Sequence, residues 1–149
     1  MSGVGSTEPP ESGGAGSAGA GAGTSAVETR RYEVAARSTD VFGRVLWSCR
    51  DQHFVADGPV QNGCRGEAVT PAELFLAGIA ACGVELLEVL AKDEGVPLRR
   101  ASVDVAGEIE PGNPVREDVT VFNAVHLAFS VSGVSEDDAL RLVERFKRR

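Results

Sequence analysis

The side chains with the most distinctive chemistry in this chain are its three cysteines, Cys49, Cys64 and Cys82. No two of them have the CxxC spacing of a metal or redox pair. The two histidines, His53 and His126, lie far apart in the sequence, so we expect neither a metal site nor a cofactor. An odd number of cysteines, in a chain with no recognisable secretion signal, also argues against structural disulfides. A buried free cysteine usually behaves as a small apolar side chain, so residue types alone leave the role of Cys82 open.

Cys82 lies within the segment that has the strongest helical pattern. Thr70 is a good N-cap, Pro71 suits the first helical position, and Glu73 completes a capping box with Thr70. Gly95 and the proline that follows it end the helix, which we predict from Pro71 to about residue 94. Its first half, LFLAGIAACGV, is apolar on every side, and a helix of that kind is buried all round. In a chain of this size, such burial requires a sheet wrapped over the helix or a partner chain, which indicates a dimer.

Alternating apolar and polar residues predict strands on both sides of this helix. Before it come strands over 32–36, 43–48 and 52–57, followed by a turn-rich loop over 58–69. After it come strands over 99–110 and 119–132, and then a helix that Ser135 caps. The order β-β-β-α-β-β-α predicts an α+β fold, in which an antiparallel sheet surrounds a long buried central helix.

Composition divides the chain into two parts. Residues 1–28 contain eight glycines and no aromatic or basic residue, so we expect a disordered tail there and a folded domain over 29–149. The domain carries 19 acidic and 15 basic side chains and has no basic stripe, which argues against nucleic acid as a partner. The start of the chain lacks the basic and apolar regions of a signal peptide, and we find no run that should span a bilayer. We therefore expect a cytoplasmic protein with no membrane partner.

The helix sequence TPAELFLAGIAACG resembles the signature of the OsmC/Ohr family: a proline at the helix start, a Glu-Leu pair, a small-residue apolar stretch and then a cysteine. The resemblance covers roughly residues 31–149 and follows the same element order. It implies an OsmC-like fold in an intertwined homodimer, with active sites at the dimer interface. It also implies thiol-dependent reduction of organic hydroperoxides, in which Cys82 is the peroxidatic nucleophile and is oxidised to a sulfenic acid.

A reactive Cys82 requires a positive group to stabilise its thiolate, because it lies too far along the helix for the helix dipole to act. Arg65, in the loop before the helix, is our candidate for this cation, and Arg44 is a weaker alternative. The other interpretation of Arg65 is an ordinary loop arginine that is solvated by water. Glu73 is the candidate acid that would orient Arg65. Its capping role is sufficient by itself, however, and its nine-residue spacing from Cys82 turns the two side chains to opposite sides of the helix. The positions that match the arginine and acid of the Ohr branch hold Val41 and Ala72.

The resolving cysteine of the family belongs to a Cys-Pro segment after the last helix, and this sequence ends at Arg149 before such a segment. Cys64 would resolve Cys82 only if its loop moves, and Cys49 at a hairpin turn is a bystander. Without either, a sulfenic acid at Cys82 would require an external thiol reductant. The alternative hypothesis is a catalytically degenerate OsmC-fold protein that binds a small apolar ligand.

Overall fold

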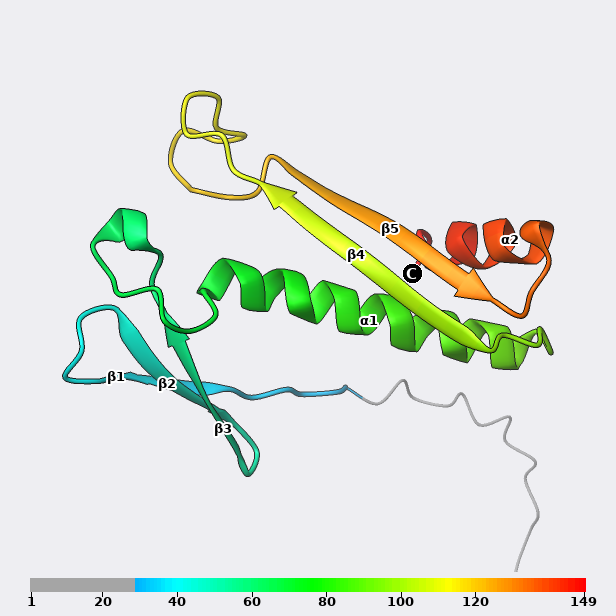
Figure 1. The fold of residues 1–149 in the computed structure, drawn as a ribbon, viewed down its shortest axis with the longest axis horizontal. Coiled ribbons are helices and arrows are strands. Elements are labelled where there is room, and N and C mark those ends of the chain that lie inside the picture. The colour runs from blue at the N-terminus through cyan, green and yellow to red at the C-terminus, as the bar shows by residue number, and fades with distance from the viewer. Residues whose placement is uncertain (1–28) are drawn as a thin grey trace, which may run out of the picture. The chain divides into compact units, whose positions relative to one another are not determined.

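The computed structural model describes residues 29–149, and the tail predicted for residues 1–28 lies outside this part. Residues Glu33–Arg149 form one compact unit. Its elements follow in the predicted order (Figure 1): β1 Ala35–Ser38, β2 Arg44–Cys49, β3 Gln52–Asp57, a 3-10 turn Val60–Asn62, α1 Pro71–Asp93, β4 Arg100–Glu108, β5 Ala124–Ser132 and α2 Glu136–Phe146. The α+β prediction is confirmed.

The strands form two antiparallel sheets, where the sequence predicted one sheet around the helix. One sheet has the order β1-β2-β3, and the other consists of β4 and β5. The hairpin between β2 and β3 closes at Cys49 and Gln52, and Arg50 in its two-residue turn has a positive φ of 53°. The first strand begins later than predicted: it starts at Ala35, and Tyr32 and Val34, which are exposed, lie outside it.

The β4–β5 hairpin presents one apolar face to α1. Residues on this face alternate with exposed ones along both strands, as the sequence predicted, and paired examples are Val103 with Phe129 and Val105 with Leu127. The helix comes close to this face at Gly83, where an added Cβ would lie 3.3 Å from the ring of Phe129. The predicted strand over 119–132 is shorter than expected, since β5 begins only at Ala124.

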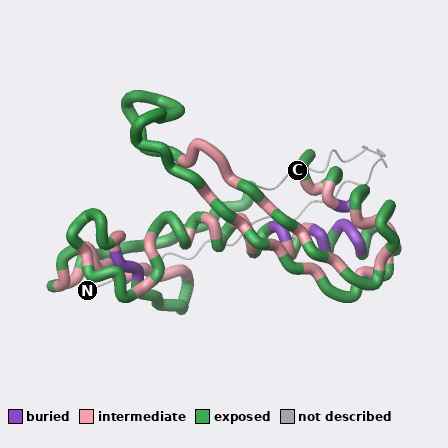
Figure 2. The backbone as a smooth tube through the Cα atoms, turned by 45° about the horizontal axis from the view of Figure 1, so that its top comes forward, coloured by how far each residue is buried: buried purple, intermediate pink, exposed green. Residues whose placement is uncertain are grey.

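The core lies where the second half of α1 meets α2. Leu87, Leu90 and Leu142 have no exposed surface, and Ala91 joins them. Glu94, at the end of α1, accepts hydrogen bonds from both Arg141 (3.0 Å to Nε) and Arg145 of α2, which ties the two helices together at this end. Figure 2 shows the buried stretches of α1 in this half of the helix.

The predicted burial of α1 on every side is wrong within a single chain. Only Gly83, Leu87, Leu90 and Ala91 are buried, and Phe75 in the first half is 57% exposed. The reason is that α1 has two broad apolar faces, whereas β4 and α2 together cover only one of them.

By length and composition α1 is also able to cross a membrane, which corrects the expectation that the chain contains no such run. It has 23 residues and a mean hydropathy of 2.0 over its most apolar window, of which 22% is buried. The core helix of a globular domain satisfies the same criterion. One side of α1 packs on β4 and α2 as the side of a core helix does.

Candidate thiol site

Cys82 lies on the uncovered side of α1, where its side chain is exposed. It is part of an open apolar groove of about 440 Å³, which is lined by Leu74, Phe75, Gly78, Ile79, Cys82 and Phe146. Five of these six residues come from α1, and their spacing of three or four residues places them along one face of the helix. The thiol is therefore accessible and has apolar neighbours on its own helix.

Two aromatic contacts hold the walls of this groove. Phe75 stacks on Phe122 with ring centroids 5.6 Å apart, and Phe146 meets Phe129 edge to face at 5.1 Å. Phe122 reaches this position because residue 107 is glycine: a Cβ there would lie 2.5 Å from the Phe122 ring. The β4–β5 hairpin thus positions one side chain of the thiol groove through Gly107.

Glu73 has the structural role that its position predicted. Its carboxylate accepts hydrogen bonds from the backbone N–H of Thr70 at 2.7 Å and from the Thr70 hydroxyl at 2.9 Å, which completes the capping box. These bonds, the backbone one first, hold the pKa of Glu73 below its ordinary value. Glu73 borders a separate depression with Leu76, Ala77, Ala80 and Val105. It therefore faces away from the groove of Cys82, as the nine-residue spacing predicts.

Arg65 is not among the residues that line the groove of Cys82. Its guanidinium is 62% exposed and lies 3.9 Å from a carboxylate oxygen of Glu67. The loop that carries Arg65 precedes Pro71, and roughly 16 Å of helix rise separate Pro71 from Cys82. The structure therefore does not bring Arg65 to Cys82 of the same chain.

A charged cluster that the sequence did not predict lies at the open end of the β2–β3 hairpin, away from its turn. Arg44 donates from Nε and Nη2 to the two oxygens of Asp57, both at 2.8 Å, and its Nη2 also donates to Glu67 at 2.6 Å. Asp57 is only 1% exposed and accepts a further bond from the backbone N–H of Glu67 at 2.9 Å. The available signal was the strand register, because Arg44 and Asp57 face each other across the predicted hairpin.

The Arg44 guanidinium dominates the electrostatics of this cluster. Its hydrogen bonds lower the pKa of Asp57 to about 2, although burial of the carboxylate acts in the opposite direction. Reciprocally, hydrogen bonds to Asp57 and then Glu67 raise the pKa of Arg44 well above its usual value. Arg44 is thus a committed partner of two carboxylates, and this structural role displaces it as the cation for Cys82.

The other two cysteines have separate surroundings. Cys64 is half-buried, and its Sγ occupies the space where a Cβ at Gly43 or Gly58 would stand, 2.2 Å and 2.4 Å away. The backbones of these glycines are themselves hydrogen-bonded, from the Gly58 N–H to the Gly43 carbonyl. Cys49 is half-buried at the hairpin end. The thiol of Cys64 thus serves as a packing group in this conformation.

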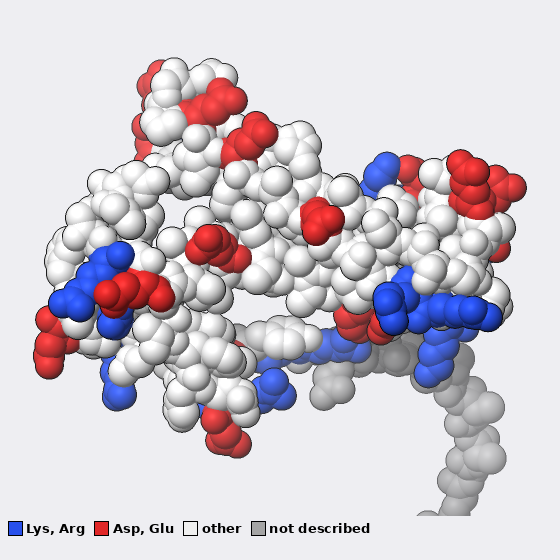
Figure 3. Space-filling model, in the orientation of Figure 1, with Lys and Arg blue, Asp and Glu red and all other residues white. Residues whose placement is uncertain are grey.

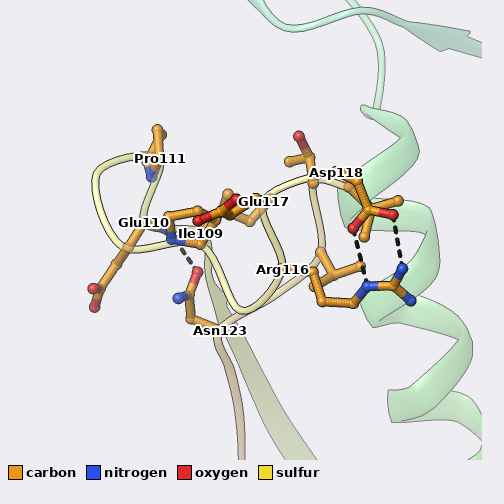
Figure 4. Close-up of a pocket in the computed structure, with 11 residues that line it drawn as sticks. Ile109, Glu110, Pro111, Arg116, Glu117, Asp118 and Asn123 are labelled. Atoms are coloured by element: carbon orange, nitrogen blue, oxygen red, sulfur yellow. Dashed lines mark hydrogen bonds and ion pairs between the residues drawn. The ribbon is translucent and has the colours of Figure 1, made fainter.

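A second open cavity, of about 290 Å³, lies in the loop between β4 and β5 (Figure 4). There Arg116 forms a bidentate ion pair with Asp118, and Asn123 accepts a hydrogen bond from the backbone N–H of Glu110. Asn123 also donates to the carbonyl of Asn113, which closes the loop. The lining mixes charged and polar residues with Ile, Val and Pro side chains, and it contains no cysteine. Within residues 29–149, no group of three or more His, Cys, Asp or Glu side chains is arranged to hold a metal ion.

Comparisons with solved structures identify the fold. The chain is similar to an OsmC-like protein from Mycoplasma pneumoniae, with a TM-score of 0.69, 16% identity, and coverage of 82% of this chain and 84% of that one. It is also similar to the organic hydroperoxide resistance protein OsmC from Legionella pneumophila (TM-score 0.64, 21% identity, 78% and 82% coverage). An organic hydroperoxide resistance protein from Elizabethkingia anophelis gives a TM-score of 0.65 at 18% identity, over 79% and 81% of the chains.

No curated protein sequence matches the chain. Residues 64–149, which include the thiol helix and everything after it, match the family model described as OsmC-like protein. This match spans more than half of the chain, and the solved structures agree with it in fold. The chain therefore belongs to the OsmC-like protein family.

Proposed function

We propose that this protein is a thiol-dependent peroxidase that reduces organic hydroperoxides, with Cys82 as its nucleophile. The observation that carries the proposal is the position of Cys82: an exposed thiol in an apolar groove of about 440 Å³. An apolar groove favours the hydrocarbon part of an organic hydroperoxide over hydrogen peroxide, which has no such part. Two of the similar folds, from Legionella pneumophila and Elizabethkingia anophelis, are organic hydroperoxide resistance proteins.

The reaction needs only the thiolate and a proton. The Cys82 thiolate attacks the terminal oxygen of the hydroperoxide, the O–O bond breaks, and the alcohol leaves after taking up a proton. Sulfur is oxidised to sulfenic acid while the peroxide is reduced. An external thiol then condenses with the sulfenic acid to a mixed disulfide and releases water, and a second thiol restores Cys82. The packed position of Cys64 between Gly43 and Gly58 favours this external route.

We also propose that the working form is a homodimer. The uncovered side of α1 presents an apolar stripe that contains Phe75, Gly78, Ile79 and Cys82, and its continuation includes Val89, which is 40% exposed. A contiguous apolar stripe of this kind favours association. A second copy would exclude water from the groove and would bring its own Arg65 toward the thiol, which the Arg65 of the same chain does not reach.

The decisive experiment measures sulfenic acid formation at Cys82 with cumene hydroperoxide and with hydrogen peroxide. We expect the organic peroxide to react at least about tenfold faster, because burying its aromatic ring is worth more than about 1.4 kcal/mol. The Cys82→Ser variant should form no adduct. A rate equal to that of a free thiol in solution would overturn the proposal.

A second candidate function is the binding of a small apolar ligand without turnover. It is favoured by the composition of the groove, in which every residue around the thiol is apolar and no cation is present. The peroxide reaction and the alkylation of Cys82 together separate the two functions. A ligand-binding protein would shield Cys82 from alkylation when an apolar compound is added, and its thiol would not react rapidly with peroxides.

A further inference from the structure

Toward the start of α1, the thiol groove ends at Leu74 and Phe75, and an aromatic ring from outside the helix holds this end. Phe75 and Cys82 line the same groove, seven residues and about 10.5 Å of helix rise apart. The Phe75 ring is stacked on Phe122, with the centroids 5.6 Å and the planes 15° apart. Because Phe75 is 57% exposed, few other contacts fix its ring, and its position depends on Phe122.

Gly107 in β4 provides the space that the Phe122 ring occupies. A Cβ at residue 107 would stand 2.5 Å and 2.7 Å from two carbons of this ring, and 3.0 Å from a methyl carbon of Leu76 on α1. Such distances are too short for packed carbon atoms, so any side chain at residue 107 would displace the ring. The ring therefore lies directly over the backbone of β4, near the first half of α1.

The backbone at Phe122 is held by the next residue, Asn123. The backbone N–H of Asn123 donates to the Glu108 carbonyl at 2.7 Å, and its side-chain oxygen accepts from the Glu110 N–H at 2.7 Å (Figure 4). Its side-chain amide donates to the Asn113 carbonyl at 2.6 Å. These hydrogen bonds fix the point at which the β4–β5 loop returns to the hairpin, so Phe122 extends toward α1 from a defined backbone position.

The other end of the groove is also an aromatic pair next to a glycine. Phe146 of α2 lines the groove and meets Phe129 edge to face, and Phe129 approaches α1 at Gly83, the residue after the thiol. Both of these rings pack against the buried core where α1 meets α2. The end beside the thiol is therefore fixed by the core, whereas the end at Phe75 is held by Phe122.

We propose that Phe122 is a specificity-determining residue, which holds Phe75 in place and thereby limits the length of hydrocarbon that the groove accepts. This inference rests on the proposed peroxidase function and specifies its substrate class as hydroperoxides of compact hydrocarbons. A hydrocarbon bound beside Cys82 extends along α1 toward Phe75, and a longer chain leaves its end in water. Each methylene group that stays in water forfeits about fourfold in rate, from about 0.8 kcal/mol per buried methylene.

The test compares second-order rate constants for sulfenic acid formation at Cys82 with cumene hydroperoxide and with dodecyl hydroperoxide, on the full chain. We expect the unmodified chain to react faster with cumene hydroperoxide. In Phe122→Ala the Phe75 ring loses its stacking partner and the groove gains space at this end. The dodecyl-to-cumene ratio of rate constants should then rise at least about fourfold, the value of one more buried methylene group. Phe122→Tyr keeps the ring and should retain the ratio of the unmodified chain.

Gly107→Ala tests the same end of the groove without removal of the ring. Its Cβ would displace the Phe122 ring, so the ratio should rise here too, and a second change of Phe122→Ala should raise it no further. Phe54→Ala is the matched control, because it removes one ring of the Trp47–Phe54 stack in the other sheet and should leave the ratio unchanged. Each ratio compares two substrates on one protein, so incomplete folding lowers both rates and leaves the ratio readable.

An unchanged ratio in Phe122→Ala would overturn the inference and leave the peroxidase proposal intact. A rise of equal size in Phe54→Ala would also overturn it, because loosened packing anywhere in the chain would then be the cause. Additive rises in the double variant would show that Gly107 does not act through Phe122. If Cys82 of the unmodified chain reacts with neither hydroperoxide faster than a free thiol does, the proposed function itself is removed and this inference with it.

Discussion

At the scale of the single residue, Asp57 shows how a buried carboxylate stays ionised in this chain. Its carboxylate is almost wholly inside, and burial alone would favour the neutral acid. The bidentate guanidinium of Arg44 and two backbone N–H groups outweigh that effect, and the pKa of Asp57 falls to about 2. Breaking such a pair leaves the remaining charge without its partner, so each member depends on the other.

The acid stability of the protein should depend on this carboxylate. Because the pKa of Asp57 is lower in the folded chain than its ordinary value of 3.8, the ion pair stabilises the fold above about pH 4, and this contribution disappears as the pH falls toward 2. Asp57→Asn should therefore unfold at lower urea concentration than the unmodified chain at pH 7. The difference between the two midpoints should shrink from pH 4 to pH 2. If the two midpoints stay equally far apart over this range, the lowered pKa of Asp57 in the folded chain is contradicted.

At the scale of the element, α1 has two different sides. The side toward β4 and α2 contains the fully buried Leu87 and Leu90, and Gly83 allows the helix to approach Phe129. Cys82 lies outside this covered side, in the groove that Phe146 of α2 borders. The capping box at Thr70 and Glu73 fixes where the helix begins.

Truncation of Leu87 should measure the packing of the covered side. Leu87→Ala removes a side chain with no exposed surface and leaves a cavity against Leu90 and Leu142, so we expect a loss of about 2–5 kcal/mol in the free energy of unfolding. Leu140→Ala in α2 is the matched control, because Leu140 is 61% exposed and should cost less than about 1 kcal/mol. Both free energies of unfolding are measured by chemical denaturation. Equal losses in the two variants would show that Leu87 does not belong to a tightly packed core.

At the scale of the whole molecule, charge and apolar surface are distributed unevenly. On the face shown in Figure 3, basic side chains gather near the end of α1, and acidic side chains stand on the loop between β4 and β5. Glu110, Glu117 and Asp118 belong to that loop, and Lys92, Arg99 and Arg100 lie near the start of β4. The residues that line the groove of Cys82 carry no charge, which is the property expected of the interface that we propose.

Introduction of a charge into this stripe should separate the proposed dimer. The unmodified chain should have twice the 15.5 kDa mass of one chain by light scattering, and Phe75→Glu should have the mass of a single chain. The reason is that a carboxylate at a residue lining the groove would be buried without a partner in the interface. Val115→Glu, at a 60% exposed residue of the β4–β5 loop, is the control and should remain dimeric. A monomeric unmodified chain would contradict the proposal.

From the sequence alone follow the element order, the start of α1 and the alternating faces of the β4–β5 hairpin. These depend on capping residues and on periodicities of two and 3.6 residues, which are local properties of the chain. The candidate thiol also follows from the sequence, because the segment that ends at Cys82 resembles a family signature. The separation of Glu73 from Cys82 follows too, since it depends only on helix geometry.

Only the tertiary structure showed which apolar face of α1 stays uncovered, because an evenly apolar helix does not indicate which side its neighbours will occupy. The Arg44–Asp57–Glu67 cluster likewise depends on the pairing of two strands and on the return of a loop, contacts between residues distant in sequence. The space that the Cys64 side chain occupies forms only where Gly43 and Gly58, which are distant in sequence, lie side by side. Local patterns determined the elements, whereas the surroundings of each thiol arose from contacts that no local pattern encodes.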